Sequence, residues 1–134
     1  MKALSIRQPW TWLIMQGHKD IENRTWNTNY RGPLLIHASS KRRGLDDPCF
    51  EEIEEISGIV VPSKGYQFGG IVGICELVDV IPPCRFPNIP RKWHQPDCFG
   101  FVLRNVKPLE FVPLKGKLRF FEVGLEVAPC STSH

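Results

Sequence analysis

The sequence has no apolar run long enough to cross a membrane. A transmembrane helix needs about 20 consecutive apolar residues, and polar or charged side chains interrupt every apolar stretch of this 134-residue chain before that length. The first residues, which include Lys2 and Arg7, also lack the apolar core of a secretory signal. These absences predict no membrane partner and an intracellular, cytoplasmic location.

Paired cysteines are missing too. The five cysteines are an odd number, and no two of them are spaced C-x-x-C, so a disulfide framework is not expected. Cys84, His94 and Cys98 could supply three zinc ligands, but a fourth is not evident and the spacings match no zinc signature. The sequence therefore predicts neither a metal nor a cofactor.

The motifs of several large enzyme classes are also absent. The chain contains no Walker P-loop, no G-x-G-x-x-G after a strand, no H-E-x-x-H and no G-x-S-x-G. These absences argue against nucleotide-driven, dinucleotide-dependent and zinc-protease chemistry. If the chain is an enzyme, its site belongs to none of these classes.

The charges that are present are unevenly distributed. Six of the 14 acidic residues lie within residues 46–55, which contain no lysine or arginine. The rest of the chain carries all 17 basic residues against the other eight acids. This distribution fits either an acidic helix on a mildly basic barrel or a basic surface for a polyanion.

Twelve prolines and 11 glycines divide the chain into short elements. One helix is expected to start near Pro9 and to end at Gly17, which suits a left-handed helix cap. A second helix is expected to open at 46–48, with an apolar stripe of Phe50, Ile53 and Ile56. Strands are predicted at the start of the chain and over 18–26, 33–38, 69–81, 99–106 and 117–123.

Five or six strands that follow one another without helical crossovers favour an α+β fold, a small, mostly antiparallel β-barrel with two flanking helices. Residues 1–127 are expected to form a single domain, and residues 128–134 a disordered tail. Cys75 lies in an apolar run and is expected to be a small buried hydrophobe.

The densest polar cluster spans residues 17–24. On a regular strand Glu22, Arg24 and Trp26 would share one face, whereas Lys19 and Glu22 would point to opposite faces. Lys19 and Glu22 can therefore meet only if the chain turns between them, which Gly17 makes plausible. The local sequence alone favours a series of solvated surface ion pairs, which contribute little to stability.

Three ordered blocks carry a resemblance to a known family. They are Leu4-Ser5-Ile6-Arg7-Gln8-Pro9-Trp10, then Gly17-His18-Lys19-Asp20-Ile21-Glu22-Asn23-Arg24, then Arg31-Gly32-Pro33-Leu34-Leu35-Ile36-His37-Ala38. Together they resemble the ASCH domain, the activating signal cointegrator homology family of the PUA-like superfamily. The hallmark of that family, G-x-K-x-x-E-x-R, is complete here in Gly17, Lys19, Glu22 and Arg24. The resemblance covers residues 2–123.

The resemblance implies a PUA-like β-barrel with a cleft lined by Lys19, Glu22 and Arg24. Domains of this kind are proposed to bind RNA, so the expected partner is RNA, another single-stranded nucleic acid or a nucleoside. The other expected ligand-binding residues are Arg7, Gln8, Trp26, Tyr30, His37 and Trp93. Cations would contact phosphate, aromatic rings would stack on bases, and Glu22 and Gln8 would bond base edges. A buried structural role stays open for His37. Residues 85–95 are expected to form a basic loop that interleaves cations with aromatic residues, which suits contact with a single strand but fits a proline-stiffened surface loop equally well.

An enzyme is the alternative. Some small ASCH-like proteins are amidohydrolases that act on N4-acylated cytidine, and their motif carries a threonine nucleophile three residues after the lysine. Lys19 matches the lysine, but Glu22 occupies the threonine position. Hydrolysis would then need Glu22 as a general base that activates water and Lys19 as the group that stabilises the oxyanion. A metal-free ribonuclease that uses the same cleft is a further variant of the enzyme alternative. A pure protein-interaction role also stays open.

Overall fold

The computed structural model describes residues 1–41, 50–84 and 92–124. Within these residues the elements are β1 (Lys2–Ile6), α1 (Trp10–Met15), β2 (Ile21–Arg24), β3 (Gly32–Ala38), α2 (Phe50–Ser57), β4 (Gly70–Ile81), β5 (Phe99–Pro113) and β6 (Phe120–Glu122). The predicted tail 128–134 and the predicted helix start at 46–48 lie outside the described residues. No helix among the described residues is long and apolar enough to cross a membrane.

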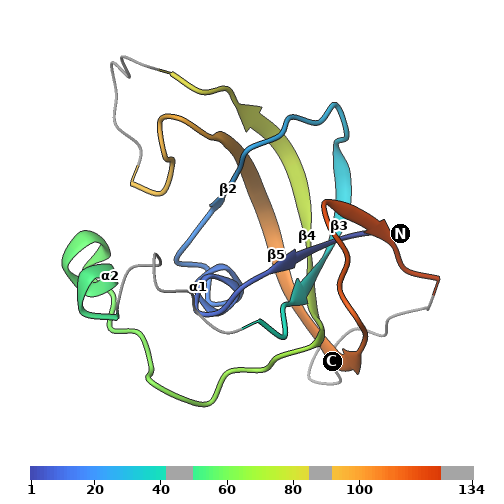
Figure 1. Cartoon of the computed structure of the whole chain (residues 1–134), viewed down its shortest axis with the longest axis horizontal. Coiled ribbons are helices and arrows are strands. Elements are labelled where there is room, and N and C mark those ends of the chain that lie inside the picture. Colours follow the sequence, from blue (N-terminus) through green and yellow to red (C-terminus); the bar gives the residue numbers. More distant parts are fainter. Residues whose placement is uncertain (42–49, 85–91, 125–134) are drawn as a thin grey trace.

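These six strands form one sheet in the order β2-β5-β4-β3-β1-β6. Among them β1 and β3 pair in parallel, and the other neighbouring pairs are antiparallel. The sheet curls strongly (Figure 1), and the pairing of β4 with β5 shifts register three times along its length. Because each such irregularity bends the strand and increases its twist, these long strands curl the sheet into a half-barrel. Helices α1 and α2 accompany it. The predicted α+β, PUA-like barrel is confirmed.

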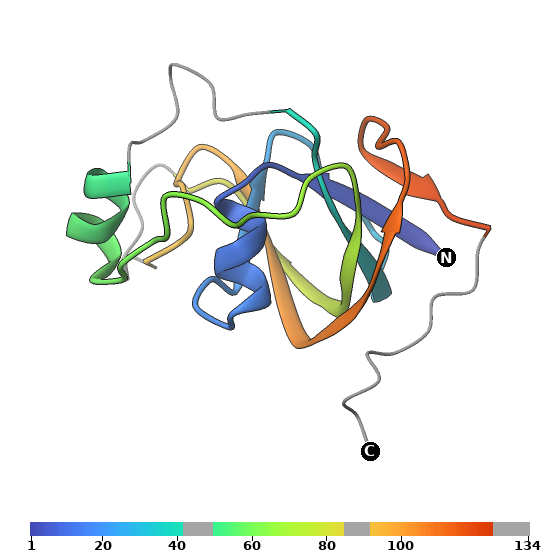
Figure 2. The same cartoon turned by 90° about the horizontal axis from the view of Figure 1, so that it is seen from below.

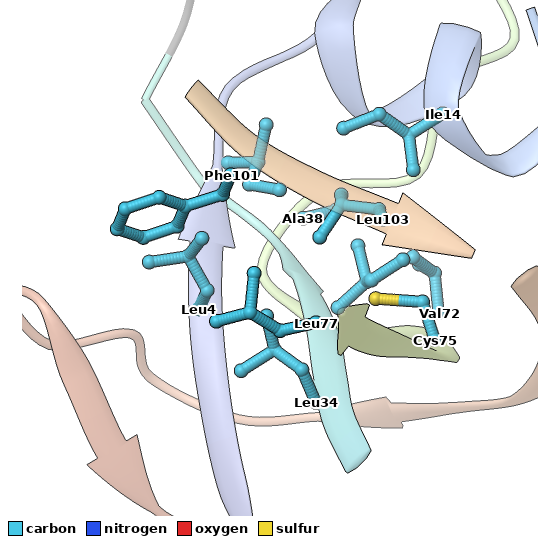
Figure 3. Close-up of a cluster of buried hydrophobic side chains, with 11 residues drawn as sticks. Leu4, Ile14, Leu34, Ala38, Val72, Cys75, Leu77, Phe101 and Leu103 are labelled. Carbon is cyan, nitrogen blue, oxygen red and sulfur yellow. The ribbon is translucent and has the colours of Figure 1, made fainter. Parts of the chain in front are cut away.

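The barrel interior is filled by apolar side chains (Figure 3). Leu4, Leu34, Leu77 and Phe101 are each at most 1% exposed. Cys75 lies among them, as predicted, and its burial together with the nearby Glu76 raises the pKa of its thiol to about 12. This core is continuous with α1, whose Ile14 packs into the same cluster.

The two helices differ in how they join the barrel. Helix α1 lies against the strands, whereas α2 stands to one side of them (Figures 1 and 2). Ile53 of α2 is buried with Leu13 and Val61 in a satellite cluster. The predicted apolar stripe is wrong at Ile56, which is 66% exposed. The helix is rotated so that Ile53 and Ser57 face inward, and the Ser57 hydroxyl donates to the Ile53 carbonyl at 2.6 Å.

Three strands also have boundaries that differ from those predicted. Strand β2 covers only Ile21–Arg24 of the predicted 18–26, because the turn after α1 occupies the residues before it. Strand β5 extends to Pro113 rather than ending near Val106, because it continues along the first half of β4 beyond a bend at Asn105. Strand β6 is limited to Phe120–Glu122, since these are the residues that pair with β1.

Candidate functional site

The turn after α1 brings Lys19 to Glu22. Gly17 has a φ of +79° and closes the helix, with its N–H donating to Ile14 O at 3.0 Å and the N–H of His18 donating to Leu13 O at 2.9 Å. This bonding is that of a Schellman cap. Strand β2 begins only at Ile21. Lys19 therefore lies in the turn and escapes the strand alternation that would have separated it from Glu22, as the sequence argument required.

A network of three charged side chains follows from this turn. Lys19 Nζ lies 2.9 Å from Glu22 Oε1, and Arg24 Nη2 lies 3.0 Å from Glu22 Oε2. Lys19 Nζ also donates to Ile21 O at 2.6 Å, and Arg24 Nη2 to Ser5 O at 2.7 Å. Each carboxylate oxygen thus faces one cation and keeps a further lone pair. The hallmark residues form one ionic network rather than solvated surface pairs.

The network is almost completely buried. Lys19 is 4% exposed and Glu22 is 8% exposed. Burial alone would raise the pKa of the Glu22 carboxyl, but the charges and hydrogen bonds of Lys19 and Arg24 outweigh burial, and the pKa lies below its ordinary value of 4.5. Glu22 is therefore a stable carboxylate. Arg24 Nε is the one buried side-chain nitrogen or oxygen in the described part of the chain that has no hydrogen-bond partner.

A cavity of about 370 Å³ opens above this network. Its walls come from both helices, the turn after α1, β2 and the segment 92–95. The lining residues are Trp10, Lys19, Glu22, Asn23, Ile53, Ile56, Lys92, Trp93, His94 and Gln95. The ammonium of Lys19 lies 5.4 Å from the centroid of the Trp10 ring. The cavity therefore combines a charged floor with two indole side chains.

Asn23 holds the segment that forms one wall of the cavity. Its amide donates to Trp93 O at 2.8 Å, and its Oδ1 accepts from the N–H of Gln95 at 2.9 Å. The indole N–H of Trp93 donates to His18 O at 2.8 Å. Strands β2 and β5 also pair beneath, with Asn23 opposite Gly100. Trp93 is thus fixed against the turn that carries Lys19.

Gly100 makes room for His94 at this wall. A Cβ at position 100 would lie 2.7 Å from His94 Cδ2 and 3.0 Å from Ile21 Cγ2. His94 Nε2 lies 2.8 Å from the carbonyl oxygen of Cys98, and the described residues contain no group of three or more potential metal ligands. His94 also lines the cavity.

The expected ligand-binding residues did not include several polar and aromatic residues that also line the cavity: Trp10, Asn23, Lys92, His94 and Gln95. Asn23 lies between Glu22 and Arg24 within the hallmark, and this position in the sequence could have identified it as a candidate site residue. The predicted strand alternation placed it on the face opposite Glu22. His94 and Gln95 are separated from the hallmark by about 70 residues, and only the fold brings them together.

Two predicted ligand-binding residues have structural contacts instead. The Gln8 amide donates to Gln67 O at 3.0 Å, and Gln8 Oε1 accepts the N–H of Trp12 at 2.8 Å. His37 is 1% exposed, with Nδ1 2.9 Å from Ser5 Oγ and Nε2 bonded to Leu114 O. Neither side chain lines the cavity above Lys19. The buried structural role left open for His37 is the one its contacts support.

The remaining predicted residues do not line this cavity. Arg7 is exposed just before α1, and Arg24 contributes to the network without lining the cavity. Trp26 and Tyr30 are half-buried, and both rings pack against Phe120 of β6. Residues 85–91 of the predicted basic loop lie outside the described residues. Of the expected ligand-binding residues, the fold brings Lys19, Glu22 and Trp93 to one cavity.

A second, larger depression of about 530 Å³ carries much less chemistry. It is lined by Gln8, Pro9, Phe50, Ser63, Lys64, Gly65, Tyr66 and Phe68. Lys64 is its one charged lining residue among those described, and the Gln8 amide is already occupied. The smaller cavity, which holds the buried network, is the stronger candidate site.

Comparisons with known proteins relate the chain to one domain family. The family model of the ASCH domain matches residues 4–112. Activating signal cointegrator 1 from Homo sapiens and the protein of the same name from Mus musculus are each 29% identical to the chain over 140 aligned positions. Each alignment covers 93% of this chain and 22% of the relative, so the chain spans about a fifth of the length of these relatives. The match over residues 4–112 shows that the chain belongs to the ASCH domain family.

Proposed function

We propose that the cavity above Lys19 and Glu22 binds one base of a single-stranded nucleic acid, with RNA as the expected partner. The observation that carries this proposal is the buried carboxylate, held between two cations, on the floor of a cavity that two tryptophans line. Domains that resemble this family are proposed to bind RNA, and the site offers the groups that such binding needs.

The aromatic walls support a planar ligand. Trp10 and Trp93 both line the cavity, and stacking of a base on an aromatic side chain contributes about 1–3 kcal/mol. The volume of about 370 Å³ suits a small ligand. Because Trp93 is attached rigidly through its own N–H and through Asn23, little further ordering is needed on binding.

The floor supports recognition of a base edge. The Glu22 oxygens keep lone pairs that can accept hydrogen bonds from amino or imino groups of a base. Lys19 uses two of its three protons on Ile21 O and Glu22, which leaves one for a ligand carbonyl. Unstacked bases of single strands expose these same edges.

The same floor favours binding over hydrolysis. A general base works best when its pKa lies near the working pH, whereas the two cations beside Glu22 lower its pKa below 4.5. Glu22 also replaces the threonine that serves as nucleophile in the amidohydrolases that the hallmark resembles. The amidohydrolase and ribonuclease alternatives thus have a weak base and no nucleophile at position 22.

Fluorescence anisotropy of a labelled single-stranded RNA of about ten nucleotides tests the proposal at two salt concentrations. We expect affinity that falls with salt, because phosphate contacts release counterions. Trp93→Ala should weaken binding by about 1–3 kcal/mol. Trp12→Ala is the matched control, since Trp12 packs near Tyr66 and does not line the cavity.

Turnover is measured on the same samples. Incubation with N4-acetylcytidine, followed by chromatography, should yield no product. Product formation that disappears in Glu22→Gln would identify an enzyme and overturn the binding proposal. Equal RNA affinities for the unaltered protein and Trp93→Ala would also contradict it.

A further inference from the structure

A second surface of the barrel combines aromatic rings with cations. Two segments meet there, 26–31 and 115–120. The first contains Arg31, the second contains Lys115, Lys117 and Arg119, and neither contains an acidic residue. We call this surface the basic seam and define it by Trp26, Tyr30, Lys117, Arg119 and Phe120. Trp26 and Tyr30 follow β2, Lys117 and Arg119 precede β6, and Phe120 begins β6; these two strands are the outer strands of the sheet.

Ring contacts hold the two segments together. Trp26 and Phe120 have ring centroids 5.0 Å apart, and Tyr30 and Phe120 have centroids 5.8 Å apart. Trp26 also packs edge-on against Phe101 of the core. The aromatic part of the basic seam is therefore anchored in the barrel, although Trp26 and Tyr30 both stay half-exposed.

Arg119 forms the outer layer of this surface. Its guanidinium carbon lies 5.4 Å from the centroid of the Trp26 ring, and the residue is exposed. Arg119 makes no ion pair with any acidic residue in the described ranges, and neither does Lys117. A guanidinium supported on an indole presents both a flat stacking surface and a positive charge.

The backbone at Arg119 is unfavourable for an arginine. Its φ is +56°, in the left-handed region that glycine and asparagine adopt most easily. The other described non-glycine residue with positive φ is Asn105, which suits that conformation. Glycine would adopt this backbone conformation at lower energetic cost than arginine. The conformation of the turn therefore does not explain the guanidinium group at position 119.

The basic seam lies close to the candidate site. Glu22 lines the cavity, and Trp26 follows it four residues later in the chain. The Cα atoms of these two residues are therefore at most about 13 Å apart, even if the chain between them is fully extended. Arg24 lies between them and bonds both Glu22 and β1. A strand with one base in the cavity can therefore continue along β2 toward Arg119.

We infer that the basic seam is a second contact site for the same nucleic acid strand, where Arg119 stacks on a neighbouring base and Lys117 contacts phosphate. This inference rests on the proposed function. Guanidinium planes and lysine ammonium groups are common partners of bases and phosphates in single strands. The basic seam thus extends binding from one nucleotide to several.

Arg119→Gly tests the inference, because glycine fits the left-handed backbone and removes the guanidinium. We expect the affinity for an RNA of about ten nucleotides to fall about tenfold, because the stacking contact with the base is lost. Affinity for a single nucleoside monophosphate should not change. Lys117→Ala should instead reduce the salt slope for the longer RNA by about 0.7, because one phosphate contact is lost. Lys64→Ala, which removes the same charge at the larger depression, should change neither affinity.

The outcomes separate the two proposals. If Arg119→Gly and Lys117→Ala bind the longer RNA like the unaltered protein, while Trp93→Ala binds it more weakly, the basic seam is overturned and the cavity is supported. If the unaltered protein binds neither RNA nor nucleotide, the proposed function fails and this inference fails with it. Equally weakened binding in Lys64→Ala and Arg119→Gly would also contradict a local contact at the basic seam.

Discussion

Two buried polar sites of this barrel share Ser5 and differ in almost everything else. Ser5 Oγ bonds His37, whose other ring nitrogen bonds Leu114 O. The Ser5 carbonyl instead accepts from Arg24 of the charged network. Because a carbonyl only accepts, His37 Nε2 carries a proton, and in the neutral ring Nδ1 accepts from Ser5.

The difference between these sites indicates what each one does. At His37 every polar atom of the ring has a protein partner, and Gly116 packs so closely that an added Cβ would lie 2.7 Å from the ring. At Glu22 both carboxylate oxygens keep spare lone pairs, and a cavity adjoins them. A buried polar group that is satisfied and enclosed holds the fold, whereas one with unused capacity beside a cavity is a candidate for binding.

Glu22→Gln gives the largest expected effect on this comparison. Removal of the carboxylate leaves Lys19 buried without its counterion, and breaking such a pair costs about 3–5 kcal/mol. Urea unfolding measures the loss of stability. Glu122→Gln is the control, because Glu122 also faces two cations, the N-terminus and Lys2, but at the surface. Similar losses of stability in Glu22→Gln and Glu122→Gln would contradict the claim that the burial of the Glu22 ion pairs makes their loss costly.

The pH dependence of stability sharpens the same point. The folded-state pKa of Glu22 lies below 4.5, so its contribution to stability is complete above pH 4.5 and is lost as the pH falls through the folded-state pKa. We expect the stability gap between the unaltered protein and Glu22→Gln to narrow below pH 4.5. A gap that stays constant down to about pH 2 would show that Glu22 titrates outside this window.

His37→Ala should have a smaller effect on stability and none on ligand affinity. The substitution leaves Ser5 Oγ and Leu114 O without their partner. Both residues are only partly buried, so water can replace part of the lost bonding and the two groups together cost about 1–3 kcal/mol. Unfolding and RNA titration of the same variant separate the two properties. A fall in RNA affinity without a fall in the free energy of unfolding would show that His37 contributes to ligand binding rather than to the stability of the fold.

Gly17→Ala is expected to have the smallest effect. Space around position 17 is open, so the cost comes from the left-handed backbone alone and is about 1 kcal/mol. Thermal unfolding measures it. Any adjustment of the turn would displace Lys19 from Glu22, so RNA affinity should fall as well. A much larger destabilisation would mean that the glycine has a packing role that its open surroundings do not indicate.

The fold could be predicted well where sequence pattern and local chemistry agree. The apolar runs at 33–38 and 69–81 became β3 and β4, and Gly17 ended α1. The rotation of α2 could not be predicted, because Ile53 and Ile56 are equally apolar and only packing against Leu13 and Val61 selects Ile53. The contact between Asn23 and Trp93 joins residues 70 positions apart, which no local pattern encodes.

The most direct test of the central claim is an NMR titration with a nucleoside monophosphate, monitored by the four indole N–H resonances. Trp10 and Trp93 line the cavity, whereas Trp12 and Trp26 do not. The cavity proposal predicts that the resonances of Trp10 and Trp93 shift together along one saturable curve while those of Trp12 and Trp26 stay in place. Shifts confined to Trp12 or Trp26, or no shift at any indole, would contradict it.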